Sequence, residues 1–206
     1  HTLHRTGNPL SPEDIQELKG VIGFQHLHQD PKTVRLGRSG MQITLDGIAK
    51  GYIVDRAVDV LRTMGVESAL VNAGGDIRVL SGSQDMPWRI GIQDPERKDR
   101  HLTRLGLGQA AVATSGSYEQ FFDPMARHHH LVDTAGHSPR RPCSVTVVAP
   151  TAMQADGLAT ALFLMPLDQG MQLASSLPGV QAALIVRGIR VMTTPGWKRL
   201  QIAEST

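Results

Sequence analysis

Short runs of alternating or β-branched residues recur along this chain, with few helical segments between them. Most of these runs predict strands, and they are residues 68–72, 77–80, 88–92, 102–107, 131–133 and 144–149. Near the end, residues 182–186 and 189–192 lie on either side of Arg187-Gly188, which predicts a hairpin. Successive strands with few intervening helices favour an α+β fold with a mainly antiparallel sheet over a doubly wound parallel sheet.

Four segments carry the signals of helices, at residues 12–20, 51–64, 152–165 and 168–177. In the first, Ser11 is a capping residue and Pro12 takes the first helical position. In the second, apolar residues recur at helical spacing and Gly65 follows them. In the third, Thr151 and Gln154 have the spacing of a capping box. The fourth pattern is weaker.

The composition excludes several classes of protein. With 206 residues, of which 40% are apolar and 19% charged, the chain is ordinary for one compact domain or a domain with a lobe, not for a disordered or fibrous protein. Twenty-one basic and 19 acidic residues give a formal charge of +2 without a dense Lys/Arg block, so no nucleic-acid partner is expected. The single cysteine, Cys143, excludes an intrachain disulfide framework and a cysteine-cluster metal site.

The start of the sequence also raises an expectation. The chain begins at His1, without a charged segment followed by an apolar core, so we expect a processed or partial product. The longest nearly apolar stretch, 157–167, is too short for a membrane-spanning helix.

The segment from Thr44 to Asp55 runs from a strand end through glycine into a predicted helix. Backbone amides at a helix start suit an anion, and Lys50 adds a positive charge that can meet a phosphate. A surface lysine on a tight turn is the alternative interpretation.

Two further segments join glycine to polar side chains. In Asn72 to Asp76, paired glycines allow a ligand to approach the backbone, and Asp76 can hold a polar group or a cation. Residues 113–119 combine hydroxyls with a glycine and a carboxylate. For both segments a plain turn is the alternative.

The last two segments contain histidines and an acidic pair. If 128–130 form a strand, His128 and His130 share a face and can chelate a metal, or one can act as an acid or base; a solvated histidine run is the alternative. Asp156 and Thr160 are spaced i, i+4, which places a carboxylate and a hydroxyl suited to Mg²⁺ on one helix face. Alternatively, Thr160 bonds back to the Asp156 carbonyl.

In this order, the five segments resemble the ApbE family, FAD-dependent flavin transferases formerly grouped as thiamine-biosynthesis lipoproteins. The similarity is close over residues 41–165 and loose over 1–40. It implies a T-fold-like α+β architecture, with a peripheral segment at 1–40 that carries a short helix and a flavin-transferase domain at 41–206. The family usually has about a hundred residues before the position of His1, so we expect this chain to lack an N-terminal portion.

The resemblance also implies an activity. Family members bind FAD and Mg²⁺ and transfer FMN to a Ser or Thr hydroxyl of an acceptor protein, releasing AMP, and some hydrolyse FAD to FMN and AMP instead. We therefore expect flavinylation of a subunit of a redox or respiratory membrane complex, in the periplasm or anchored to the inner membrane. An FAD pyrophosphatase and a non-catalytic flavin-binding protein are the alternatives.

The resemblance assigns roles by position. His130 and Asp156 are the expected catalytic residues, since one of them would accept the proton of the attacking hydroxyl. The metal would be held by the Gly47 carbonyl, Asp156 and Thr160. FAD would be contacted by Thr44, Lys50, Gly75, Asp76, Thr114, Ser115, Gly116 and Leu131. The family commonly has Asp at position 44 and Gly at position 46, so Thr44 and Asp46 depart from its pattern.

Overall fold

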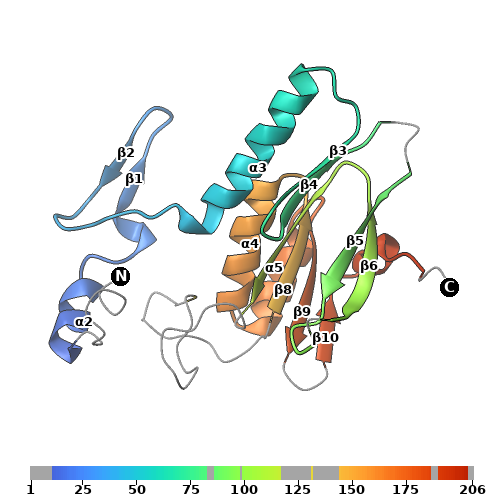
Figure 1. The fold of residues 1–206 in the computed structure, drawn as a ribbon. Helices are drawn as coiled ribbons and strands as arrows, with labels where there is room; N and C mark the ends of the chain where they lie inside the picture. The colour runs from blue at the N-terminus through green and yellow to red at the C-terminus, as the bar shows by residue number, and fades with distance from the viewer. Residues whose placement is uncertain are drawn as a thin grey trace. The chain divides into compact units, whose positions relative to one another are not determined.

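The computed structural model describes residues 11–82, 86–97, 99–116, 131, 144–186 and 190–203 (Figure 1). The chain divides into two compact units, one of residues 1–44 with 120–139 and one of residues 45–119 with 140–206. The functional division expected from the sequence, at 1–40 and 41–206, stays a prediction. Among the residues that the structure describes, no helix combines the length and apolar character needed to cross a membrane.

The first unit contains one helix, a short 3₁₀ turn and a two-stranded antiparallel sheet within its described part. These elements are α2 (Pro12–Lys19), η1 (Phe24–His26), β1 (Leu27–Gln29) and β2 (Val34–Leu36). The predicted helix start is confirmed, because the Asp14 amide donates to Ser11 Oγ at 3.0 Å and the Ser11 amide donates to the Asp14 carboxylate at 3.2 Å.

The second unit is built on a six-stranded sheet in the order β10-β9-β8-β7-β4-β3, in which every neighbouring pair is antiparallel. Its strands are β3 (Ala69–Ala73), β4 (Asp76–Leu80), β7 (Ala111–Gly116), β8 (Ser144–Ala149), β9 (Gln181–Val186) and β10 (Arg190–Thr193). A separate hairpin consists of β5 (Trp88–Gln93) and β6 (His101–Leu107). The expected α+β class with a mainly antiparallel sheet is confirmed.

Three helices of this unit pack beside the sheet (Figure 1). They are α3 (Asp46–Thr63), α4 (Ala152–Leu164) and α5 (Leu167–Ser176), and a 3₁₀ turn, η2 (Trp197–Leu200), follows β10. Helix α4 contacts β7 and β8, and α3 packs on α4. The approach of α3 to α4 is close at Gly51, where a Cβ atom would collide with the Ala152 carbonyl oxygen. A larger residue at position 51 would therefore force the two helices apart.

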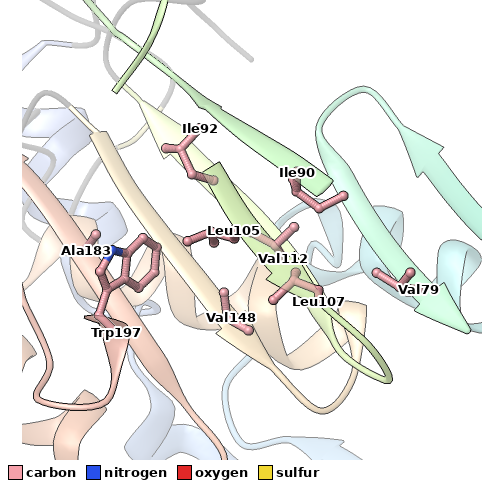
Figure 2. Close-up of a cluster of buried hydrophobic side chains, with 9 residues drawn as sticks. All are labelled: Val79, Ile90, Ile92, Leu105, Leu107, Val112, Val148, Ala183 and Trp197. Atoms are coloured by element: carbon pink, nitrogen blue, oxygen red, sulfur yellow. The ribbon is translucent and has the colours of Figure 1, made fainter. Parts of the chain in front are cut away.

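An apolar cluster fills the space between the sheet and the β5–β6 hairpin (Figure 2). Its buried members are Val79, Ile90, Ile92, Leu105, Leu107, Val112, Val148, Ala183 and Trp197. Trp197 is 1% exposed and closes the cluster from η2. Because side chains alternate along a strand, the opposite face of the sheet is left for the helices and for the candidate site.

The structure corrects three expectations about local structure. Helix α3 begins at Asp46, five residues before the predicted start, because Leu45 at its N-cap makes no side-chain capping bond that the sequence could reveal. Residues 114–116 lie within strand β7 and do not form the alternative turn. Leu131 is not in a strand, and the rest of the run 131–133 lies outside the described residues.

Candidate functional site

Lys50, in the first turns of α3, reaches the turn between β3 and β4. Its Nζ lies 3.3 Å from Asp76 Oδ1 and donates to the Gly74 carbonyl at 3.4 Å. The two-residue loop is a genuine hairpin turn, since Gly74 and Gly75 have φ angles of 59° and 98°, in the region that favours glycine. Residues 72–76 therefore do form a turn, which was the alternative to a ligand-binding segment. The same turn brings Asp76 against Lys50, which lies 26 residues earlier in the chain.

Asp76 is the most unusual carboxylate of the described residues. Its side chain is 2% exposed, and its Oδ2 atom has no hydrogen-bond partner. The pKa of Asp76 is raised to about 7: burial raises it most, the negative charge of Asp156 also raises it, and Lys50 partly opposes both effects. A buried acceptor without a partner is costly, so this oxygen is suited to a cation or a polar ligand.

Asp156 lies on α4 and joins this helix to α3. It is 8% exposed, and its Oδ2 accepts the Gly51 amide at 3.0 Å. In a regular helix that amide would donate to the carbonyl of Gly47. The Asp156 carboxylate therefore meets α3 one turn after Gly47, whose carbonyl is one of the expected metal ligands.

Thr160, one turn further along α4, has its hydroxyl 3.1 Å from Ser115 Oγ in β7. This contact replaces the alternative in which Thr160 bonds back to its own helix. Thr114 Oγ1 instead lies 2.8 Å from Thr146 Oγ1 in β8. Because Thr114 is two residues from Val112 of the apolar cluster, it shares the face that is turned away from α4.

The remaining predicted site residues lie in both units of the chain. Gly47 lies in the first turn of α3, Gly116 is buried at the end of β7, and Thr44 is in the first unit, as is Leu131, which is 7% exposed. His130, with the rest of the histidine run, lies outside the described residues. The structure therefore brings together Lys50, Gly75, Asp76, Asp156, Ser115 and Thr160 around α3, α4 and the β3–β4 turn.

The donor set of this site is made of oxygen atoms. Within the described ranges, no group of three or more His, Cys, Asp or Glu side chains is placed to hold a metal ion. Two carboxylates beside hydroxyl and carbonyl oxygens match instead the preference of a hard cation such as Mg²⁺, which keeps several waters or substrate oxygens in its shell.

No role was expected for Asp55 from the sequence, yet its side chain lies at the junction of α3, α4 and β4. Its carboxylate accepts the Ala152 and Met153 amides at 2.8 and 2.9 Å and pairs with Arg78 at 2.8 Å. The available signal was an acidic residue between Val54 and Val58, which are buried on the packed face of α3.

Comparison of the whole sequence with known proteins agrees with the geometry of this site. A model of the ApbE family matches residues 2–185. The chain belongs to the ApbE family. A curated FAD:protein FMN transferase of Treponema pallidum (strain Nichols) is 35% identical over 205 residues, covering 90% of this chain and 57% of that protein. One from Vibrio cholerae is 34% identical over 169 residues, covering 80% and 51%.

Solved ApbE structures share the fold. The crystal structure of the ApbE protein of Thermotoga maritima matches with a TM-score of 0.84 and 31% identity, over 98% of this chain and 69% of that one. The flavin transferase ApbE of Vibrio cholerae matches with a TM-score of 0.81 and 30% identity, over 94% and 63%. This chain spans about half the length of the curated ApbE relatives named above.

Proposed function

We propose that this chain provides the FAD- and Mg²⁺-binding core of an FAD:protein FMN transferase. Two curated relatives have this name, at 35% and 34% identity. The observation that carries the proposal is the meeting of Lys50, Asp76 and Asp156, a cation beside two buried carboxylates. This pairing suits a site that binds a metal ion and an anionic pyrophosphate together.

The residues present fit Mg²⁺. Asp76 Oδ2 is buried without a partner, and Asp156 Oδ2 accepts the Gly51 amide, one helical turn after Gly47. Asp156, Thr160 and the Gly47 carbonyl would hold the ion, with Asp76 close enough to contribute its charge. When bound, Mg²⁺ neutralises the charge that grows on the leaving phosphate.

The reaction we propose forms one bond and breaks one. The oxygen of an acceptor Ser or Thr hydroxyl bonds to the phosphorus of the FMN half of FAD, and the bond from that phosphorus to the bridging oxygen breaks, releasing AMP. Lys50 binds the pyrophosphate and balances its charge, while the Gly74 carbonyl and Asp76 hold the ammonium group in place. The hydroxyl proton passes to His130 or Asp156.

The acceptor and the location belong to the same proposal. Resemblance to the family supports an acceptor subunit in a redox or respiratory membrane complex, reached in the periplasm or at the inner membrane. The near-neutral charge of the chain does not oppose binding of a pyrophosphate, because one lysine and the amides at the start of α3 act locally.

Product analysis tests the proposal. The chain is incubated with FAD, Mg²⁺ and a candidate acceptor protein, and the acceptor is denatured and examined for flavin fluorescence. FMN retained on the denatured acceptor, with AMP in solution, supports transfer. Free FMN with AMP identifies a pyrophosphatase, and bound FAD without AMP release identifies a flavin-binding protein; either result contradicts transfer by this chain.

A further inference from the structure

Asp55 links the three elements that carry the candidate site. It lies on α3, four residues after Gly51 and five after Lys50. Its carboxylate accepts the first two amides of α4, which carries Asp156, and pairs with Arg78 of β4, the strand that begins at Asp76. The side chain is 8% exposed, so these bonds form in a largely buried setting.

The contacts between α3 and α4 form a reciprocal pair. Asp55 of α3 accepts from Ala152 at the start of α4, and Asp156, one turn later on α4, accepts from Gly51, one turn earlier on α3. The absence of a side chain at Gly51 allows the backbones to come close enough for both bonds. Two hydrogen bonds that run in opposite directions determine both the spacing and the register of the helices.

We propose that Asp55 is a positioning residue for Asp156, a proposed metal ligand, and for Asp76, the carboxylate beside it, an inference that rests on the proposed function. Through the α4 amides it sets where Asp156 lies along α3, and through Arg78 it holds the strand that carries Asp76. Lys50 is on the same helix as Asp55, so the bonds of Asp55 also fix where Lys50 lies relative to Asp76 and Asp156. Groups that orient metal ligands without touching the metal have large effects on metal affinity.

The test compares Asp55→Asn with Asp59→Asn. Asp59 lies one turn later on α3, is 38% exposed, and is 3.2 Å from Arg56 and 3.7 Å from Arg78, but among the described residues it makes no hydrogen bond or ion pair with α4. Both variants lose one negative charge beside Arg78, and only Asp55→Asn loses the charged cap of α4. Circular dichroism first establishes that each variant is folded, and Mn²⁺ binding is then measured by electron paramagnetic resonance at a temperature well below unfolding.

We expect Asp55→Asn to bind Mn²⁺ about 10- to 100-fold more weakly than wild type, and Asp59→Asn to stay within about twofold. Raising Mg²⁺ should restore FAD turnover in Asp55→Asn but not in Asp156→Ala, which lacks a proposed ligand. A folded Asp55→Asn variant with wild-type Mn²⁺ affinity would overturn the inference.

Arg78→Gln keeps the inference testable if Asp55→Asn does not fold. This variant keeps the cap of α4 and removes only the link to β4. We expect a severalfold loss of Mn²⁺ affinity, and unchanged affinity would count against the positioning role. Wild-type chain that binds no Mn²⁺ would overturn the proposed metal site itself, whereas wild-type binding with unaffected variants would overturn the role of Asp55 alone.

Discussion

The two faces of the six-stranded sheet in the second unit are built from different chemistry. One face packs against the β5–β6 hairpin through apolar side chains closed by Trp197, and the other packs against α4 with polar groups at its end. Thr114 and Ser115 are neighbours in β7, yet Thr114 pairs with Thr146 and Ser115 pairs with Thr160 of the candidate site. Alternation along a strand therefore decides which hydroxyl of a Ser/Thr-rich segment belongs to the site.

Trp197→Ala should have the largest effect on stability, because it empties the apolar face of its largest fully buried side chain. We expect the free energy of unfolding to fall by about 3–5 kcal/mol. Urea denaturation measures the loss, and the Mn²⁺ affinity of the folded variant at low temperature should equal that of wild type. A loss below about 1 kcal/mol would show that this face does not depend on Trp197.

Lys50→Ala should have the largest effect on activity from the helical face. Removal of a positive group that balances developing charge costs about 10²- to 10³-fold in turnover. The measurement is the rate of AMP release from FAD at saturating Mg²⁺, with Lys198→Ala as the control because the Lys198 side chain in η2 is exposed. Equal rates in the two variants would remove Lys50 from the mechanism.

Because Asp76 is ionisable, the free energy of unfolding should depend on pH. The apolar face of the sheet cannot produce this effect. Its pKa is raised from 3.8 to about 7 in the folded chain, first by burial and then by Asp156, so the folded state binds the proton more tightly than the unfolded state. The contribution is present below about pH 4 and is lost as the pH rises through about 7, a change of a few kcal/mol without metal.

The control for this pH dependence is Asp76→Asn, which cannot ionise. Denaturation of the metal-free chain at several pH values should show a flatter profile for the variant than for wild type. Parallel profiles between pH 4 and pH 8 would show that Asp76 titrates in the same range whether the chain is folded or unfolded.

Ser115→Ala and Thr114→Val should give the smallest effects and separate the two faces most directly. Ser115→Ala removes the partner of Thr160 and should weaken Mn²⁺ binding a fewfold at nearly unchanged stability. Thr114→Val leaves the Thr146 hydroxyl without this partner and should lower stability by about 1 kcal/mol at unchanged Mn²⁺ affinity. The reversed pattern would mean that the two faces have been assigned wrongly.

Local signals in the sequence predicted much of the fold. The caps at Ser11 and Thr151 are confirmed, since each side chain accepts an amide three residues later. Most of the predicted strands, and the hairpin of β9 and β10, are also confirmed. These features depend on residues close together in the chain, where backbone preference and short-range hydrogen bonds suffice.

The candidate site was predicted in part. The i, i+4 spacing of Asp156 and Thr160 placed an acidic and a hydroxyl group on one helix face, and α4 confirms that arrangement. Helix α3 was predicted to begin too late, because its N-cap residue, Leu45, makes no capping bond through its side chain. The role of Asp55 could not be predicted, because the amides it caps lie 97 and 98 residues later in the chain.

The class of the fold, the family and most of the residue types in the site follow from the amino-acid sequence. Three features depend on the packed chain: Asp76 is buried against Lys50 with an oxygen left without a partner, Ser115 and not Thr114 meets Thr160, and Asp55 caps α4. Burial and contacts between distant segments depend on how the whole chain packs, and packing shifts the pKa of a carboxylate in ways that its neighbours in sequence do not reveal.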